Sequence, residues 1–450
     1  MKKYLIFALL FVCIGFAASA FSLVGTWEGT LSLGPQKITV AFNIAQVDAD
    51  RWSATLDVPA QGAHGIPCEA TVGCDNVEIK IAALNASFSG TIASDNVIKG
   101  SFTQNGFNLP LELTKKEDLD PAAPIEPLPK LRNEQLLSVV TKDGIKISGT
   151  LALPGNQHKA PYPAVVLVSG SGTQDRDETI LGHKPFKVIS DYLTSQGIAV
   201  FRYDDRGAGE SSPLKGNETT IDFASDAQAA FNCLRRQSII DTTRMGYIGH
   251  SEGGQIAFIN ASTDKRVAFV ISLAGPAACG RDVMVQQNLS MLDMQGMPYT
   301  LSQVDELNAI FDDIVNITDT TALRQSLRQR MAASTLQHYT PEQLEQSVAV
   351  MTSPWYLSFI RFNPKPYLEK ITCPVLALNG EWDFQVNAKQ TFDALKASVK
   401  NVTCVELPRH NHLFQECPSR IESMNYASQG EMSATTLNYI KDFIMGITHQ

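Results

Sequence analysis

From residue 25 to about residue 116, apolar and polar residues alternate in short runs. These runs are TWEGTLSL, KITVAFNIAQV, RWSATLDV, VEIKIAAL, ASFSGTIA, VIKGSFTQ and LPLELT, and turn residues such as Gly34-Pro35 separate them. An alternation with a period of two predicts strands with one buried face, and turns about every ten residues are typical of antiparallel strands. We therefore expect residues 21–117 to form a small all-β domain, either a barrel or a sandwich, with Trp27 in its core.

A proline-rich segment follows this domain. It contains DLDPAAPIEPLP, which offers little apolar surface to bury. Closely spaced prolines favour an extended, stiff chain. We expect residues 118–133 to be a linker between two domains, which agrees with a length of 450 residues, since one domain usually has fewer.

After the linker the pattern changes. A hairpin, LLSVVTKDGIKISGTLAL with Asp143-Gly144 at its turn, precedes the apolar runs AVVLVSG, IAVFRY, RMGYIG, VAFVISLAG, PVLALNG and VTCVEL. Segments with helical spacing, such as FASDAQAAFNCLRRQ, lie between most of them. Continuous apolar strands that alternate with helices predict an α/β domain over residues 134–450, with a mostly parallel sheet covered by helices on both faces. Its site is expected at the carboxyl ends of the strands.

One long interval of the second domain lacks strand patterns. Residues 277–367 contain SQVDELNAIFDDIV, TALRQSLRQRMAAS and PEQLEQSVAVM, which have the spacing of amphipathic helices. Thr340-Pro341 has the residue types of a helix cap and first helical position. We expect a helical insertion that caps the site, or alternatively an oligomer contact, so a homo-oligomer stays open.

The first 20 residues, MKKYLIFALLFVCIGFAASA, combine a basic start, an apolar run and an A-x-A pattern before Phe21. This combination predicts a cleaved signal peptide and hence an exported bacterial protein, periplasmic or secreted. The alternative is a membrane anchor, but the apolar run is shorter than the roughly 20 residues that a spanning helix needs. We expect no membrane span after cleavage.

The net charge and the cysteine content indicate which partners, cofactors and disulfides to expect. The net charge of -9 provides no basic surface for nucleic acid, so a small-molecule substrate is expected instead. No C-x-x-C pair is present, and we expect neither a metal nor an organic cofactor. An exported protein can form disulfides, and Cys68 with Cys74 is the expected pair.

The sequence G-H-S-E-G places Ser251 between a predicted strand, RMGYIG, and a predicted helix, GGQIAFINAS. This strand, turn and helix context is that of a nucleophile elbow, in which Gly249 and Gly253 leave room for a tight turn. A serine hydroxyl needs a base and a group that orients the base. Asp383 follows the predicted strand PVLALNG and His412 follows VTCVEL, so both lie at strand ends.

Five further residues complete the candidate site. The peptide N–H groups of Ser171 and Glu252 are the expected oxyanion donors, because Ser171 lies in a glycine-rich loop and Glu252 follows the nucleophile. His410, two residues before His412, is the second candidate for the base or a substrate contact. Arg176 lies in the charged run DRDE and either forms salt bridges within its loop or binds an anionic substrate. Trp355 either lines the substrate pocket or packs in the core.

Five motifs together resemble a known family. VSGSGTQDRDE, FRYDDRGAGES, GHSEGG, NGEWDFQV and HNHLF, in this order, are similar to the bacterial α/β-hydrolases related to the prolyl-oligopeptidase-like (dipeptidyl-peptidase-like) serine esterases. The resemblance covers residues 134–450 and implies ester hydrolysis through an acyl-enzyme, with Ser251, Asp383 and His412 as triad. The RHNH stretch departs from the commoner single histidine of the family.

Three functions are compatible with these observations. The leading hypothesis is an exported serine esterase that acts on small or medium acyl esters. The second is a serine peptidase or aminoacyl hydrolase of the prolyl-oligopeptidase type. The third is a non-catalytic envelope or carbohydrate-binding protein, which missing triad residues would favour.

Overall fold

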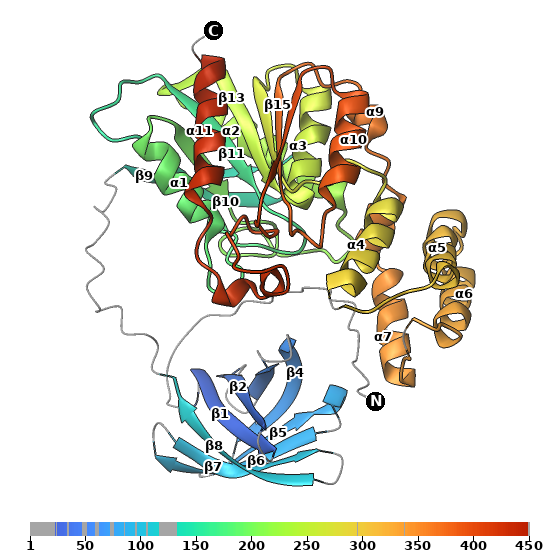
Figure 1. The fold of residues 1–450 in the computed structure, drawn as a ribbon. Coiled ribbons are helices and arrows are strands. Elements are labelled where there is room, and N and C mark those ends of the chain that lie inside the picture. The colour runs from blue at the N-terminus through green and yellow to red at the C-terminus, as the bar shows by residue number, and fades with distance from the viewer. Residues whose placement is uncertain are drawn as a thin grey trace. The chain divides into compact units, whose positions relative to one another are not determined.

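The computed structural model describes residues 23, 25–33, 36–46, 52–58, 63–72, 76–84, 86–94, 97–104, 107–116, 133–294, 296–336 and 338–448. The predicted signal peptide and all but the last residue of the predicted linker lie outside these residues. The described chain forms two compact units, one up to Lys116 and one from Asn133, which Figure 1 shows in blue to cyan and in green to red. We describe each unit by itself.

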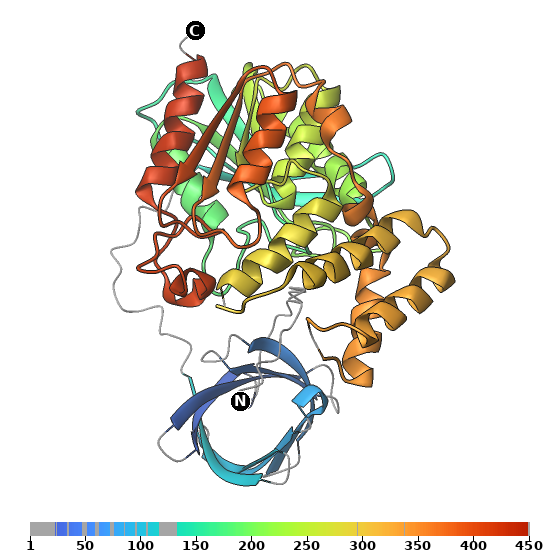
Figure 2. The same ribbon diagram turned by 45° about the vertical axis from the view of Figure 1, so that its right-hand side comes forward.

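The first unit is a closed barrel of eight antiparallel strands in sequence order. Figure 2 shows its strands as a ring. The barrel closes where β1 pairs with β8, through Trp27 opposite Lys115 and Glu28 opposite Thr114. The strands are β1 (Gly25–Leu33), β2 (Gln36–Gln46), β3 (Trp52–Val58), β4 (Ala63–Val72), β5 (Asn76–Ile81), β6 (Ala86–Ser94), β7 (Val97–Gln104) and β8 (Phe107–Lys115), with a 3-10 turn η2 (Ala82–Leu84) after β5. Of the two predicted architectures, the structure is therefore the barrel.

Strand β4, AHGIPCEATV, is the one barrel strand that the alternation did not predict. It contains Gly65 and Pro67, and both residue types weaken a strand pattern because glycine lacks a side chain and proline lacks an N–H donor. In the barrel, Pro67 nevertheless pairs in register with Thr55 of β3. Pairing with a neighbouring strand thus overrides a weak local preference here.

The barrel interior is filled by apolar side chains. Trp27, Phe42 and Phe88 are fully buried, and the rings of Phe42 and Phe88 lie 5.7 Å apart. The Trp27 indole N–H donates to the Leu23 carbonyl at 3.0 Å, which satisfies its one polar group. Trp27 is therefore a core residue, as predicted.

The second unit contains an eight-stranded sheet with the order β16-β15-β14-β13-β11-β12-β10-β9. Strand β10 is antiparallel to both of its neighbours, β9 and β12, and all pairs from β12 to β16 are parallel. The hairpin turn has Gly144 at φ 83°, as its Asp-Gly sequence predicted. The strands are β9 (Glu134–Val140), β10 (Lys146–Ala152), β11 (Tyr162–Val168), β12 (Ala199–Tyr203), β13 (Ile240–His250), β14 (Phe269–Leu273), β15 (Val375–Gly380) and β16 (Val402–Leu407).

Helices cover both faces of this sheet. Alternate residues of β11 point into two separate apolar clusters, with Val166 in one and Val165 in the other. The first cluster includes residues of α2 (Thr220–Arg235), α3 (Glu252–Thr263) and α10 (Ala388–Ser398), and the second those of α1 (Pro185–Ser195) and α11 (Ala434–Thr448). Short 3-10 helices, η3 (Glu422–Met424) and η4 (Tyr426–Ser428), precede α11. The mostly parallel sheet with two helical layers is confirmed.

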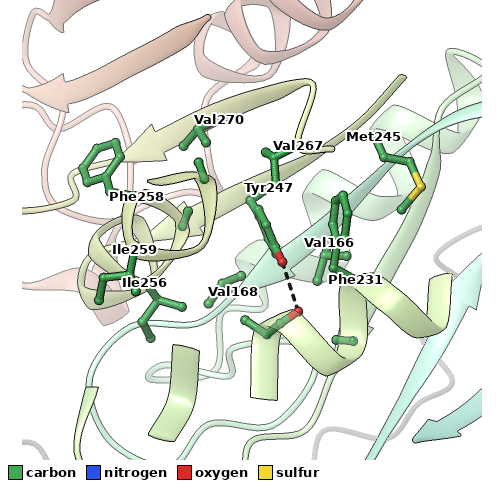
Figure 3. Packing of buried hydrophobic residues seen from close by; sticks show 14 of the residues in the cluster. Val166, Val168, Phe231, Met245, Tyr247, Ile256, Phe258, Ile259, Val267 and Val270 are labelled. Atoms are coloured by element: carbon green, nitrogen blue, oxygen red, sulfur yellow. Dashed lines mark hydrogen bonds between the residues drawn. The ribbon is translucent and has the colours of Figure 1, made fainter. Parts of the chain in front are cut away.

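The strand that leads to Ser251 is anchored in the first cluster. Tyr247 of β13 stacks on Phe231 of α2 at 5.0 Å, and its hydroxyl donates to the Ala227 carbonyl at 3.3 Å. Figure 3 shows this hydrogen bond as a dashed line, with Val166 and Phe231 on one side of Tyr247 and Ile256, Phe258 and Ile259 of α3 on the other. Close packing on this side fixes the end of β13, from which the elbow projects.

The interval between β14 and β15 is helical, as predicted. It contains α4 (Gly280–Met294), α5 (Leu301–Asn316), α6 (Thr320–Ala332), α7 (Pro341–Met351), α8 (Pro354–Arg361) and α9 (Lys365–Leu368). Thr340 caps α7 by accepting from the Gln343 N–H, and Pro341 is its first residue. These helices, which we call the helical insertion, enclose an apolar cluster of their own that includes Phe311, Leu323 and Tyr356.

The predicted disulfide is not found among the described residues. Cys68, Cys233, Cys279, Cys373, Cys404 and Cys417 all have free thiols, and Cys74 lies outside the described residues. Cys68 lies in β4, where its Sγ donates to the Ile66 carbonyl at 3.2 Å. Burial raises the pKa of its thiol to about 12. Across the described part of the chain, we find no helix with the length and apolar character that crossing a membrane requires.

Candidate active site

Ser251 lies in a strained turn between β13 and α3. Its backbone has φ 51° and ψ -123°, which is rare for a residue with a side chain. Its N–H donates to the Leu273 carbonyl of β14 at 2.8 Å, and its carbonyl accepts from the Gly254 N–H at 2.9 Å. Strain of this kind persists where surrounding contacts fix it, often at functional sites.

The two glycines of the motif are required by close backbone contacts. A Cβ on Gly253 would lie 2.0 Å from the Val168 carbonyl oxygen, and one on Gly249 would lie 2.1 Å from that of Gly253. Gly170 also approaches closely, since its Cβ would lie 3.1 Å from the Ser251 Cβ. The elbow therefore packs against the end of β11, as the pattern predicted.

Asp383 and His412 meet at the strand ends. His412 Nδ1 lies 2.7 Å from Asp383 Oδ2, and both residues are buried. The second oxygen of Asp383 accepts the N–H groups of Gln385 and Val386 at 2.8 and 3.0 Å, and the Asn379 amide donates to Oδ2 at 3.2 Å. Three donors and the imidazole thus hold this carboxylate in one orientation.

His412 lies beside the elbow. Its ring centroid is 4.8 Å from that of His250, the residue before Ser251, and its backbone carbonyl is 3.0 Å from His250 Nε2. Among the described residues, no hydrogen bond joins Ser251 Oγ to the His412 ring. Hydrogen bonds between nucleophile and base are often long without substrate and shorten in the substrate complex.

The ring of His410 forms its hydrogen bonds with groups outside the elbow. Its Nδ1 lies 2.7 Å from the Pro408 carbonyl and its Nε2 lies 2.7 Å from Ser433 Oγ, and the residue is buried. Both ring nitrogens therefore have partners outside the elbow, whereas His412 contacts Asp383. The geometry favours His412 of the two histidines and makes His410 a support of its loop.

The two expected oxyanion donors come from separate elements. Ser171 follows Gly170 in the loop after β11, and Glu252 is the first residue of α3. The first N–H groups of a helix have no acceptor within the helix, so that of Glu252 is available to a ligand. The N–H of Gly170 is instead bound to Glu178 at 2.7 Å.

The Glu252 carboxyl links the elbow to the helical insertion. It accepts from Thr220 Oγ1 at 2.6 Å and from the Trp355 indole N–H at 3.1 Å. Burial raises the pKa of Glu252, although hydrogen bonds from Thr220, Trp355 and Ser171 act in the opposite direction. Trp355 is the second residue of α8 (Pro354–Arg361) and stacks on Phe359 at 5.6 Å. Trp355 therefore contacts the elbow through its indole N–H and packs against the apolar cluster of the insertion through its ring.

Arg176 is held within its own loop. Its guanidinium donates to both oxygens of Asp204 at 3.0 and 2.6 Å, to Thr150 Oγ1 at 2.8 Å and to Glu210 at 3.1 Å. These contacts fit the first of the two expected roles, salt bridges within the loop. An anionic substrate would have to displace them.

Two buried residues at this site were not identified from the sequence. Glu178 is fully buried, and its Oε1 lies 2.8 Å from Nδ1 of the buried His250. Glu178 belongs to a charged run, which is usually solvent-exposed, and His250 is one of several residues that the elbow pattern tolerates. A histidine directly before the nucleophile and an acidic residue eight positions after Gly170 were the available signals.

No group of three or more His, Cys, Asp or Glu side chains within the described ranges is arranged to hold a metal ion.

Comparisons with known proteins identify a family for the larger unit. Residues 184–417 match the Hydrolase_4 family, described as "Serine aminopeptidase, S33". Esterase EstD of Thermotoga maritima is 26% identical over 307 residues, which cover 67% of this chain and 65% of EstD. An uncharacterized 31.7 kDa protein of Escherichia coli is 25% identical over 216 residues, or 47% of this chain and 72% of that protein. This chain thus spans just under two thirds of the length of EstD.

Solved structures also superpose on part of the chain. Est1E from Butyrivibrio proteoclasticus, with ferulic acid bound, is 15% identical, covers 70% of this chain and 100% of its own, and gives a TM-score of 0.43. The α/β hydrolase GrgF from Penicillium sp. sh18 is 16% identical, covers 70% of this chain and 99% of its own, and gives a TM-score of 0.46.

Proposed function

The chain belongs to the Hydrolase_4 family of α/β-hydrolases, described as serine aminopeptidase, S33, and from this premise we propose that it is a serine esterase. Its substrates are carboxylic esters of small or medium acyl groups, and it acts through an acyl-enzyme on Ser251. The observation that carries the proposal is the buried 2.7 Å contact between His412 and Asp383 beside the strained elbow.

The mechanism follows from the contacts. Asp383 accepts the Nδ1–H of His412, which leaves Nε2 to take the Ser251 proton as the hydroxyl attacks the ester carbonyl. The N–H groups of Ser171 and Glu252 stabilise the oxyanion that forms. His412 then gives its proton to the departing alcohol, and a water molecule activated by the same histidine releases the acid.

The central test replaces the nucleophile. Ser251→Ala should lower kcat for p-nitrophenyl esters to the level of residual catalysis, a loss of about 10⁶-fold for a serine nucleophile. A fluorophosphonate probe should label the wild-type protein and leave the variant unlabelled. Retained turnover in the variant would refute the assignment, and an unlabelled wild type would favour the non-catalytic alternative.

An aminopeptidase is the second candidate, because the family description names that activity. Such an enzyme commonly needs a carboxylate for the substrate's amino group. Glu252 is the acidic side chain next to the nucleophile, but it is bound to Thr220 and Trp355. The name of EstD also supports ester hydrolysis. Comparing kcat/KM for an acyl ester with that for an aminoacyl p-nitroanilide separates the two.

We also propose that the protein is exported, to the periplasm or medium of a bacterium. The support is the sequence of residues 1–20, with its basic start, apolar run and A-x-A pattern. N-terminal sequencing of the protein recovered from the periplasmic fraction should begin at Phe21. Recovery of the intact chain in the cytoplasm alone would refute export.

A further inference from the structure

Two buried charged side chains beside the elbow have no part in the proposed mechanism. His250 Nδ1 lies 2.8 Å from Glu178 Oε1, and His250 Nε2 lies 3.0 Å from the His412 carbonyl oxygen. The Gly170 N–H donates to the same Glu178 oxygen at 2.7 Å. This single pair therefore contacts three segments. They are the loop after β11 that contains Gly170 and Ser171, which we call the oxyanion loop, the elbow, and the loop after β16 that contains His412, which we call the His412 loop.

The partners of His250 indicate where its protons lie. A backbone carbonyl can only accept, so Nε2 carries a proton toward His412. Glu178 Oε1 accepts the Gly170 N–H and lies 2.8 Å from His250 Nδ1, so Nδ1 has an acceptor as well. An acceptor at each nitrogen favours the imidazolium, which makes Glu178 and His250 a buried ion pair.

The charges around His250 act in the same direction. Burial lowers the pKa of His250, but the Glu178 charge and hydrogen bond, the His412 carbonyl and the Asp383 charge together raise it above its usual value. Glu178 faces it from the loop after β11, the His412 ring from the loop after β16, and Asp383 from the loop after β15. Asp205, after β12, in turn experiences the charge of Glu178.

Glu178 is held in this position against two unfavourable features. Its backbone is left-handed with φ 52°, which residues with a side chain rarely adopt. Its Oε2 atom is buried without a hydrogen-bond partner among the described residues. The loop fixes it nevertheless, because the Asp175 carbonyl accepts the Glu178 N–H and the Asp175 carboxylate accepts from Asp177 and Thr179. Such features are often retained near functional sites.

We propose that Glu178 and His250 are positioning residues, whose buried ion pair sets the oxyanion loop and the His412 loop relative to Ser251. The proposal rests on the serine hydrolase function proposed above. Neither residue touches the substrate. Both act through other groups, Glu178 through the Gly170 N–H and His250 through the His412 carbonyl.

A dependence on pH follows from the ion pair. Because the folded protein holds the His250 proton more tightly than the unfolded chain, the stabilisation is complete at low pH and is lost as pH rises through the raised pKa. Loss of the pair loosens the His412 loop. We therefore expect an alkaline decrease in kcat that reports on His250, with KM for a small ester unchanged.

The test is Glu178→Gln, which keeps an oxygen for Gly170 but removes the charge. We expect kcat to fall by about 10- to 100-fold, as displacement of reacting groups by about 1 Å does. The alkaline decrease should move to lower pH, and KM should stay within about twofold of the wild type, since the variant leaves the substrate contacts in place. The matched control is Glu431→Gln, because Glu431 lies 3.1 Å from His183 Nδ1 in an exposed pair outside the elbow. This control should change neither kcat nor the pH profile.

A second measurement tests the proposal on the wild-type protein, in case Glu178→Gln folds poorly. In the wild-type protein, side-chain ¹H–¹⁵N spectra should show two protonated nitrogens on His250 above neutral pH, assigned by their loss in His250→Gln. A singly protonated His250 at neutral pH, or an unchanged profile in a folded Glu178→Gln, would overturn the proposal. If Ser251→Ala is inactive while Glu178→Gln behaves as wild type, only the positioning role fails. If Ser251→Ala retains turnover, the esterase assignment fails instead.

Discussion

The barrel and the larger unit bury different kinds of side chain. Among the described residues of the barrel, every buried side chain is apolar, with Trp27, Phe42 and Phe88 at its centre. The larger unit has apolar clusters on both faces of its sheet, but it also buries polar and charged side chains, and its carboxyl edge buries Glu178, Asp205, His250, Glu252 and Asp383. Both units therefore have an apolar core, but among the described residues only the larger unit also buries charged side chains.

This difference indicates where chemistry is located. Burying an ionisable group costs several kcal/mol unless partners compensate for the lost water. At the strand ends, Asp383 has three hydrogen-bond donors and an imidazole, and Glu252 has Thr220 and Trp355. A packing role alone does not require such groups, as the barrel shows. We infer that the edge retains them for catalysis, whereas the barrel core serves stability.

Among substitutions of the buried charged side chains at this edge, Asp383→Asn is expected to have the largest effect. Asparagine can still accept the N–H groups of Gln385 and Val386, so the fold should persist, but it does not hold His412 in the required tautomer. A loss of about 10⁴-fold in kcat is expected, as for the corresponding change in other serine hydrolases. Steady-state kinetics with a p-nitrophenyl ester and circular dichroism of the variant provide the check. A loss below tenfold would mean that the buried charge at this edge has a structural role only.

The next effect concerns the barrel. Phe88→Ala removes a fully buried ring and should destabilise the barrel by about 3–5 kcal/mol, while kcat for a small ester stays unchanged. Urea unfolding followed by near-UV circular dichroism, with activity measured in parallel, tests both parts.

A control for this variant lies in the other core. Phe231→Ala removes the ring stacked on Tyr247. It should lower the free energy of unfolding of the larger unit by a similar amount, and activity should be lost at a lower urea concentration. Were Phe88→Ala to lower kcat in the folded protein, the barrel would contribute to catalysis and the contrast between the units would not hold.

Patterns along the chain predicted most of this organisation for identifiable reasons. Alternation predicted an all-β domain, a barrel or a sandwich, and all of its strands except β4, in which Gly65 and Pro67 obscure the pattern. The elbow context predicted the position of Ser251 because a tight turn between strand and helix requires glycines at fixed spacing. Asp383 and His412 were predictable from strand ends, which parallel sheets gather along one edge.

Contacts between distant segments could not be predicted in this way. Glu178 and His250 are 72 positions apart, and nothing in the run DRDE distinguishes its buried acid from its half-buried neighbours. His410 and His412 differ only in which partners the loop brings to each ring. The partner of the Glu252 carboxyl, Trp355, comes from the helical insertion 103 positions away. Side-chain pairs of this kind depend on tertiary structure, which local patterns do not encode.

The smallest expected effect is at the junction of the elbow and the helical insertion. Trp355→Phe keeps an aromatic ring against Phe359 but removes the indole N–H that donates to Glu252. A hydrogen bond of this kind contributes about 1 kcal/mol, so we expect KM for a medium-chain ester to rise by about fivefold with kcat nearly unchanged. The control Phe359→Leu removes the stacking partner and leaves the hydrogen bond. If Phe359→Leu raises KM more than Trp355→Phe does, the insertion is held to the elbow by apolar packing, and Glu252 would then resemble the barrel residues in serving stability alone.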